Sequence, residues 1–307
     1  MRAIAKFPNN KKPIVACFVG GSECVEAAKV LAELNIPMYD DPAKAMSAMG
    51  ALREAAKFAH SCTSDAVGFK DVNQKRAREV IAAARADGRC ALTELEAKEI
   101  FTAYGLPVAP SKLAHTEDEA CSLAKQIGLP VVMKIVSPDI LHKSDAGGVK
   151  VNIKTEADVR TAFQTIIKNA KSYRADAKIH GVLVQQMAPL GREVIVGSVK
   201  DPQFGPTVMF GLGGIFVEVL KDVTFRVAPI CVECAKEMLP EIRAYKILQG
   251  VRGEKRLDQE RLAEVIARVS HMVNDLGDEI IETDANPIML YEEGKGLMVV
   301  DARIILK

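Results

Sequence analysis

The spacing of apolar positions divides the chain into two parts. In the first part, four elements are expected in the order strand, helix, strand, helix, at residues 13–20, 22–34, 36–39 and 42–60. This order is typical of half of a parallel α/β layer. Two strands in about 60 residues can hardly cover both faces of such a sheet. We therefore expect this segment to complete a sheet that another part supplies.

The second part mixes strands and helices more closely. Residues 61–78 begin as a small, polar stretch and predict a linker, and residues 79–307 predict a second domain with two lobes, about 79–180 and 181–307. Further strands are expected at 182–186, 193–200, 206–210 and 223–228, and helices at 233–248 and 258–276. The fold class that follows is α/β, built as α+β lobes.

Threonines and glycines predict where the first helices of this domain start and end. Thr93, Thr116 and Thr155 are each followed three residues later by Glu or Asp, which is the pattern of a capping box. Gly105 and Gly128 fit the position just after a helix, and each leads through Leu-Pro-Val into a strand. The boundaries of these elements are therefore marked by the sequence itself.

Composition narrows the class of protein. The 307 residues carry a formal net charge of +1, which gives no overall field for nucleic acid or a membrane. No run approaches the roughly 18 apolar residues of a membrane span. The seven scattered cysteines fit reduced thiols better than a disulfide framework. We therefore expect a cytoplasmic protein without a nucleic-acid or membrane partner, in which any anion binding is local.

The loop at 137–150 is the most informative stretch, because it joins two apolar, β-branched segments and is long for a compact domain. Its lysines supply positive charge and its Gly-Gly pair supplies open backbone N–H groups, as a polyphosphate requires. Its histidine adds a nucleophile or a proton carrier. The alternative is a solvated hairpin with a surface histidine. The candidate residues are Lys134 on the preceding strand, His142, Lys143, Gly147 and Gly148.

The C-terminal segment predicts a β-hairpin with a polar face. Alternation along its first strand puts three polar side chains on one side, Glu282, Asp284 and Asn286. A turn at 292–296 brings Asn286 nearly opposite Asp301. An amide oxygen and a carboxylate are hard ligands that suit Mg²⁺, which also keeps waters and shares phosphate oxygens. The alternative is a polar strand face capped by Arg303.

Two weaker candidates lie between these segments. The strand end at 182–187 offers backbone donors and acceptors beside an apolar shelf, which suits an adenine ring, and the acid that begins the next strand can accept from ribose. The glycines at 211–214 are not a dinucleotide fingerprint, because a strand rather than a helix is expected after them. They are more consistent with a backbone that approaches a ligand or a partner loop. The residues concerned are Gln185, Gln186, Met187 and Glu193, and then Gly211, Gly213, Gly214 and Glu218.

In combination these residues resemble the ATP-grasp fold. The subtype resembles the nucleoside-diphosphate-forming (ADP-forming) acyl-CoA synthetases, relatives of succinyl-CoA synthetase. The resemblance covers roughly residues 80–307, and its most specific strings lie at 137–145, 201–214 and 284–287. Residues 13–60 resemble the closing part of the flavodoxin-like CoA-ligase domain that precedes ATP-grasp in fused members.

The resemblance implies a role for each candidate residue. In this family one phosphohistidine forms in the CoA-binding part, and a histidine resembling His142 relays the phosphoryl group to ADP. Lys134 would contact ATP phosphates, Glu193 would bind the ribose, and Asn286 and Asp301 would hold Mg²⁺. The other residues expected at the nucleotide are Lys143, Gly147, Gly148, Gln185, Gln186 and Met187. The stretch with Gly211, Gly213, Gly214 and Glu218 would form a loop for phosphoryl transfer.

The expected protein is the ATP-grasp (β-type) subunit of an ADP-forming acyl-CoA synthetase, with acetyl-CoA as the expected substrate and ATP/ADP and Mg²⁺ as cofactors. The sequence has no Gly-rich CoA-binding segment, so a separate CoA-binding α-type subunit is the expected partner in a hetero-oligomer, with residues 13–60 as a docking element. Two alternatives stay open: an ATP-grasp carboxylate–amine ligase that works without phosphohistidine, and a non-catalytic nucleotide-binding regulatory subunit. The remaining histidines are expected to be structural or surface residues, namely His60, His115, His180 and His271.

Overall fold

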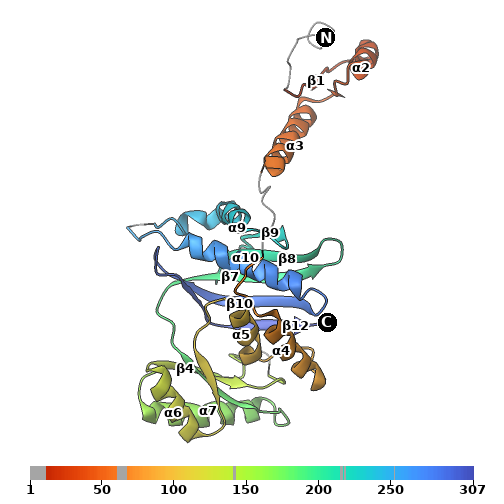
Figure 1. Ribbon diagram of the computed structural model, residues 1–307. Coiled ribbons are helices and arrows are strands. Elements are labelled where there is room, and N and C mark those ends of the chain that lie inside the picture. The colour runs from red at the N-terminus through yellow and green to blue at the C-terminus, as the bar shows by residue number, and fades with distance from the viewer. Residues whose placement is uncertain (1–11, 61–67, 141–142, 215–216, 218, 252) are drawn as a thin grey trace. The chain divides into compact units, whose positions relative to one another are not determined.

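A computed structural model of the chain describes residues 12–60, 68–140, 143–214, 217, 219–251 and 253–307 (Figure 1). The chain divides into two units, Met1–Asp65 and Ala66–Lys307. Two predicted site residues, His142 and Glu218, lie outside the described residues. Within the described ranges, no helix is both long enough and apolar enough to cross a membrane.

The first unit contains the four expected elements in the expected order: β1 Ala16–Cys17, α2 Glu23–Glu33, β2 Met38–Tyr39 and α3 Pro42–His60. β1 and β2 pair in parallel, but each is only two residues long, so the strand expected at 13–20 is wrong in its extent. Among the described residues these strands have no third strand to pair with. The buried apolar core of the unit is small and consists of Ala16, Leu31 and Ile36.

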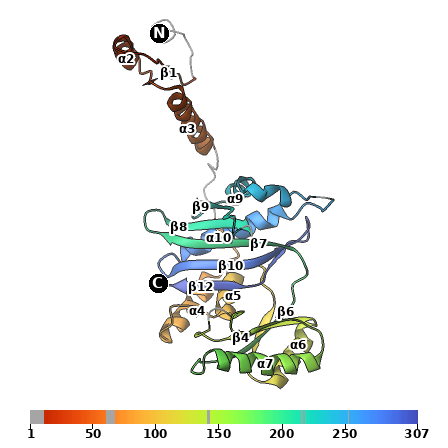
Figure 2. The same ribbon diagram turned by 180° about the vertical axis from the view of Figure 1, so that it is seen from behind.

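In the second unit, one lobe is built on a four-stranded antiparallel sheet with strand order β3-β6-β4-β5. The strands are β3 Ser111–Ala114, β4 Val131–Val136, β5 Val149–Ile153 and β6 Gly181–Gln186. Helices α6 Glu117–Ile127 and α7 Glu156–Tyr173 share the apolar core of this sheet and lie along one of its faces (Figures 1 and 2). Met133 and Ile135 of β4 belong to that core, so Lys134 between them points to the opposite face.

The other lobe is built on a six-stranded sheet. Its path runs β11-β10-β7-β8-β9, and β12 also pairs with β10. The strands are β7 Arg192–Asp201, β8 Gly205–Leu212, β9 Val223–Val227, β10 Ile280–Leu290, β11 Leu297–Val299 and β12 Ala302–Leu306. One apolar core joins this sheet to α4 Gln74–Ala86, α5 Glu94–Ala103, α9 Val232–Met238 and α10 Gln259–Asp275. The long helix α10 lies in front of the sheet in Figure 1 and behind it in Figure 2.

The sequence predicted that one lobe ends at residue 180 and the other begins at residue 181. The structure divides the chain differently. β6 begins at Gly181 and is an inner strand of the first sheet, between β3 and β4. Residues of α4 and α5, which precede that sheet in the sequence, belong to the core of the other lobe. The domain start expected at residue 79 falls inside α4. Both differences arise because long-range packing, and not local pattern, decides which lobe an element joins.

The ends of helices α5, α6 and α7 in the second unit agree with the sequence. Thr93 and Thr155 form complete capping boxes, and Thr116 caps α6 with its side chain. Gly105 and Gly128 follow α5 and α6 with φ angles of 75° and 96°. Such positive φ angles are the backbone conformation that glycine adopts at little cost. The punctuation that the sequence predicts is therefore confirmed here.

The single helix expected at 233–248 is wrong. α9 ends at Met238, and two 3₁₀ turns follow at Leu239–Glu241 and Arg243–Ile247. Pro240 lies in the first of these turns and has no N–H to continue an α-helix. The second turn begins where the Asp222 carboxylate accepts two backbone hydrogen bonds at 2.8 and 2.9 Å.

Candidate functional site

A cavity of about 540 Å³ is lined by residues of both lobes in the second unit. Its walls come from the start of α5, the end of β4 with the loop after it, and the strands β10 and β12. The cavity therefore joins the two segments that the sequence singled out, the 137–150 loop and the C-terminal hairpin. Its described polar lining residues are Thr93, Glu94, Ser137, Lys143, Ser144, Asp145, Asp284, Asn286, Asp301 and Arg303.

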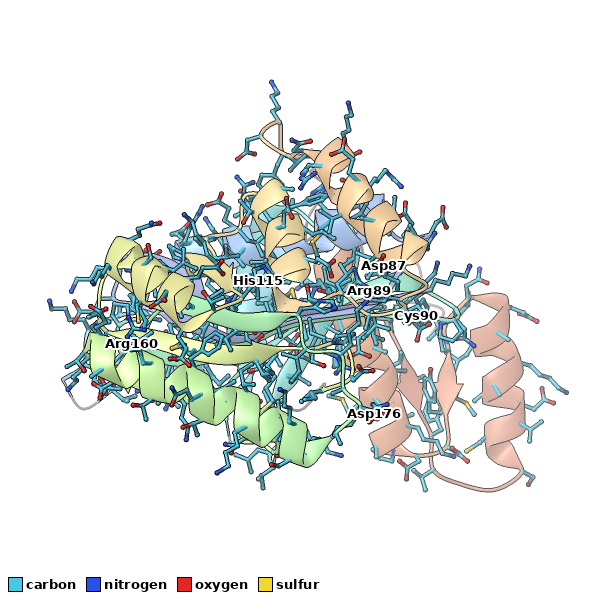
Figure 3. All side chains as sticks on the ribbon, turned by 90° about the horizontal axis from the view of Figure 1, so that it is seen from below. Asp87, Arg89, Cys90, His115, Arg160 and Asp176 are labelled. Carbon is cyan, nitrogen blue, oxygen red and sulfur yellow. The ribbon has the colours of Figure 1, made fainter. Side chains whose placement is uncertain are left out.

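The capping box of α5 fixes one of these lining residues in place. Thr93 Oγ1 accepts a hydrogen bond from Glu96 N, and Glu96 Oε2 accepts one from Thr93 N at 2.8 Å. Arg89, which follows the end of α4 (Figure 3), donates to the two carboxylate oxygens of Glu96 at 2.7 and 2.8 Å. Glu94 lies between these anchored residues, so its side chain leaves the helix at a defined place.

Glu94 is a buried carboxylate that three lysines contact. Lys134 Nζ lies 2.7 Å and Lys98 Nζ lies 2.8 Å from Glu94 Oε1, and Lys143 Nζ donates to Glu94 Oε2. Burial acts to raise the pKa of Glu94, but the three ammonium charges outweigh burial and hold this pKa far below its ordinary range. Glu94 is therefore ionised. The sequence did not point to it.

Lysines also connect Glu94 to the C-terminal hairpin. Lys134 Nζ donates to Asp301 Oδ2 at 3.0 Å and to Val300 O at 3.4 Å, and Lys143 Nζ lies 3.7 Å from Asp301 Oδ1. Burial acts to lower the pKa of Lys134, but Glu94 and Asp301 raise it above its ordinary value. Lys134 is buried and is not among the described lining residues, whereas Lys143 lines the cavity.

The hairpin has the register that the sequence predicts. Ala285 pairs with Ala302, and Asn286 N donates to Asp301 O at 3.3 Å. Asp284 and Asn286 flank the buried Ala285 and therefore lie on the same face of β10. Their side chains and that of Asp301 all line the cavity. The strand alternation and the turn position were sufficient to place these residues together.

The oxygen donors of the hairpin fit Mg²⁺. Asp284 Oδ1 is buried and has no hydrogen-bond partner among the described residues, and burial raises the pKa of Asp284 to about 6. The described residues contain no group of three His, Cys, Asp or Glu side chains suited to a metal ion. Mg²⁺ needs only one or two carboxylates, because waters and substrate phosphates complete its shell. Asp284 thus joins Asn286 and Asp301 as a residue that would hold this ion.

The sequence predicted open backbone N–H groups at Gly147 and Gly148, but in the structure both groups donate hydrogen bonds within the loop. Gly147 N donates to Ser144 O at 2.9 Å, and Gly148 N donates to Lys143 O at 2.8 Å. Gly147 has a φ angle of 59°, and a Cβ on Gly148 would collide with a side chain of β4. These glycines therefore shape a turn that places Lys143 at the cavity. His142 directly precedes Lys143 in the sequence and is not described.

The strand end at 185–187 also lacks the open hydrogen-bond donors that the sequence predicted for an adenine ring. Gln185 is fully buried, and its Oε1 accepts from Lys98 Nζ at 2.5 Å. The backbone N–H groups of Gln186 and Met187 donate to proline carbonyls just before β3 and β4. The open donors expected for an adenine ring are therefore occupied by protein groups. None of these three residues is among the described lining of the cavity.

Glu193 lies near the start of β7, and the glycine stretch at the end of β8 lies next to it. Gly213 N donates to Glu193 O at 2.9 Å, and a Cβ on Gly213 would collide with the Glu193 side chain. Gly211 lies within β8, and Gly214 follows this strand with a φ angle of 63°. The structure thus joins the expected ribose residue to the expected backbone loop, outside the described lining of the cavity. Glu218 is not described.

Three of the remaining histidines make contacts of a structural kind. His271 is buried in α10, and its ring meets that of Phe69 edge-on with the centroids 5.4 Å apart. His115 is exposed at the start of α6 (Figure 3), and its Nδ1 lies 3.0 Å from His180 O. The side chain of His60 is not described.

Comparison with known families agrees with this geometry. A profile of the ATP-grasp domain matches residues 83–306. This range contains the sheets of both lobes and all described residues that line the cavity. The chain belongs to the ATP-grasp family. The match begins within α4 and ends within β12, so the expectation of an ATP-grasp fold for this part of the chain is confirmed.

Individual relatives show which members of the ATP-grasp family this chain is similar to. The β subunit of acetate–CoA ligase (ADP-forming) I of Pyrococcus furiosus is 57% identical over 231 residues, which are 75% of this chain and 98% of that subunit. The 4-hydroxybutyrate–CoA ligase (ADP-forming) of Nitrosopumilus maritimus is 46% identical over 294 residues, 96% of this chain and 42% of that protein. A solved structure of acetyl-coenzyme A synthetase 1 from Candidatus Korarchaeum cryptofilum has a TM-score of 0.66 and 45% identity, covering 75% of this chain and 100% of that one. It contains coenzyme A and Mg-AMPPCP, with a phosphohistidine segment that points towards the nucleotide-binding site.

The relatives differ in how they match the first unit. The Pyrococcus subunit leaves a quarter of this ATP-grasp chain unmatched, whereas the Nitrosopumilus protein matches 96% of it. The residues of this chain that lie outside the Nitrosopumilus match are far fewer than the residues of Met1–Asp65. Most of this first unit therefore has a counterpart in the longer protein. The chain spans 42% of the length of that protein.

Proposed function

We propose that the chain is the ATP-grasp part of an ADP-forming acyl-CoA synthetase. The reaction converts acyl-CoA, ADP and phosphate reversibly into the free acid, CoA and ATP, with acetyl-CoA as the expected acyl-CoA. One observation carries the proposal: a lysine and the oxygen donors of the hairpin meet in one cavity, namely Lys143, Asn286 and Asp301. The 57% identity to the β subunit of a Pyrococcus acetate–CoA ligase (ADP-forming) supports it.

Nucleotide phosphates are expected at the Lys143 end of the cavity. The Lys143 side chain is 20% exposed and lines the cavity, whereas the buried Lys134 adds positive charge next to Asp301. Asn286, Asp301 and Asp284 would hold Mg²⁺, which when bound offsets charge on the phosphate oxygens. In phosphoryl transfer, positioning and electrostatic stabilisation dominate, and these residues supply both.

His142 is the proposed carrier of the phosphoryl group. A neutral imidazole is a good nucleophile near pH 7, and the described part of its loop already lies at the cavity through Lys143. When ATP forms, a β-phosphate oxygen of ADP bonds to phosphorus as the P–N bond of phosphohistidine breaks. The electron pair of the broken bond returns to the imidazole nitrogen, which takes up a proton. The phosphohistidine segment of the Korarchaeum structure supports the same role.

The CoA-binding half of the reaction is assigned to an α-type subunit. The first unit supports this partner, because its two short strands and small core form only part of an α/β layer. It also exposes large apolar side chains that a partner can cover, namely Phe18, Val19, Val25, Met46 and Leu52. We therefore propose that residues 13–60 dock against the CoA-binding subunit.

ATP formation from acetyl-CoA, ADP and phosphate tests the proposed function. The chain is co-expressed with a CoA-binding α-type subunit, and ATP is measured in the presence of Mg²⁺. We expect activity in the wild type and a loss of about 100-fold in Asp301→Asn, because a metal ligand is weakened. The control Asp278→Asn changes an exposed carboxylate before β10 and is expected to keep full activity. ATP formation that Asp301→Asn leaves unchanged contradicts the proposal.

A further inference from the structure

We propose that Glu94 is a positioning residue for phosphoryl transfer, because it fixes the ammonium groups of Lys134 and Lys143 at the cavity. This inference rests on the proposed function, in which Lys143 contacts phosphate and the buried Lys134 adds positive charge beside Asp301. Each carboxylate oxygen of Glu94 contacts one of these two lysines. Oε1 accepts from Lys134 at 2.7 Å, and Oε2 accepts from Lys143.

A third lysine keeps the Glu94 carboxylate from turning. Lys98 lies one helical turn after Glu94 on α5, and its Nζ is 2.8 Å from Glu94 Oε1. Lys98 Nζ is itself held by Gln185 Oε1 at 2.5 Å. With both oxygens engaged and the helix start capped, the carboxylate has a single orientation. The buried Gln185, which does not reach the described cavity lining, thus acts through Lys98 and Glu94.

The burial of this cluster favours a positioning role over a stabilising one. The side chains of Glu94, Lys98 and Lys134 are 1%, 3% and 6% exposed. Buried ion pairs contribute little net stability, because removing charges from water offsets their attraction. A lysine is a point charge on a flexible stem, and a fixed partner is what orders it. The cluster therefore orders ammonium groups that would otherwise rotate.

Lys143 is the member of the cluster that phosphate can engage. Its side chain is the most exposed of the three lysines, at 20%, and it alone of them is among the described lining residues. Within this cluster, three ammonium groups contact two carboxylates, Glu94 and Asp301, so the charge of Lys143 is not fully balanced by Glu94. A phosphate group can therefore bind Lys143 while Glu94 continues to hold Lys134.

Glu94→Gln tests the inference, because it keeps the shape of the side chain and removes its charge. The full-length chain is mixed with Mg²⁺ and [γ-³²P]ATP, and the rate of label transfer to the chain and its KM for ATP are measured. We expect the saturated rate to fall about 100-fold, as for misplaced reacting groups, with KM changed less than about threefold. The matched control is Glu264→Gln, which breaks a similar cluster with Arg261 and Arg268 on α10. It is expected to keep the wild-type rate; equal losses in the two variants, or a wild-type rate in Glu94→Gln, overturn the inference.

A second variant separates positioning from folding. Glu94→Gln leaves Lys98 buried without its counter-charge, so the double variant Glu94→Gln/Lys98→Met removes that charge as well. We expect its thermal midpoint to return towards the wild-type value while the transfer rate stays low. A rate that recovers with the thermal midpoint overturns the inference. If His142→Asn still takes up label, the proposed function fails instead, whatever the Glu94 variants do.

Discussion

Among single residues, Asp284 lies in the environment least favourable to its charge. One of its oxygens is buried without a partner among the described residues, and burial raises its pKa to about 6. The nearby carboxylates of Glu282 and Asp301 add to this shift, and Arg303 only partly offsets it. Such strain at a cavity is expected where a bound cation relieves it.

Asp284→Asn is therefore expected to stabilise the chain in the absence of Mg²⁺. Its pKa is about 6 in the folded chain and near the ordinary 3.8 in the unfolded chain, so the folded state binds more protons between these values. The free energy of unfolding then falls as pH rises through this window, and the loss is complete above it. Removing the charge should raise the free energy of unfolding by up to about 3 kcal/mol at pH 7.5.

Urea unfolding at several pH values measures this difference. Below pH 3.8 the wild type and Asp284→Asn should converge, because the carboxyl is then mostly protonated in both states. The exposed Asp278→Asn serves as the control and should follow the wild type throughout. An Asp284→Asn variant that is less stable than the wild type at pH 7.5 would show that the charge is not strained.

Among the elements, helix α5 connects local capping to the site. Thr93 and Glu96 close its capping box, and Glu94 between them reaches the lysines of the cavity. The cap was readable from the Thr-x-x-Glu pattern, because it depends on neighbouring residues only. The role of Glu94 could not be predicted from the sequence, because this role depends on how α5 packs against β4 and the hairpin.

Thr93→Ala and Thr116→Ala separate these two contributions. Each removes the N-cap side chain of one helix, so each should lower the free energy of unfolding by about 1 kcal/mol. Only Thr93→Ala should also slow label transfer from ATP, because only α5 carries Glu94. Equal transfer rates in the two variants would show that the cap of α5 has no part in placing Glu94.

Other elements show the same division between local and distant causes. The register of Asn286 with Asp301 followed from strand alternation and the position of the turn, and it is confirmed. The open N–H groups expected of Gly147 and Gly148 were wrong, because the carbonyls that occupy them belong to a turn that composition alone does not reveal. Contacts that join segments far apart in the sequence, such as Lys134 with Glu94, need the folded structure.

For the whole molecule, the proposed function depends on contacts between the two lobes of the second unit. Lys134 belongs to the sheet of one lobe, and the Asp301 carboxylate it contacts belongs to the hairpin of the other. Only the family resemblance assigned Lys134 and Asp301 to the same nucleotide, because no local pattern connects residues so far apart in the sequence. The small core of the first unit fits the same view of a protein that works with a CoA-binding partner.

Phosphohistidine formation on the full-length chain tests this account most directly. The chain is incubated with Mg²⁺ and [γ-³²P]ATP, and the stability of the bound label to acid and to base is measured. We predict acid-labile, base-stable label on the wild type and on the control His115→Asn, which changes an exposed histidine of the first lobe. His142→Asn should take up at least about 100-fold less label, because the accepting nitrogen is absent. Equal label on His142→Asn, or no label on the wild type, would contradict the account.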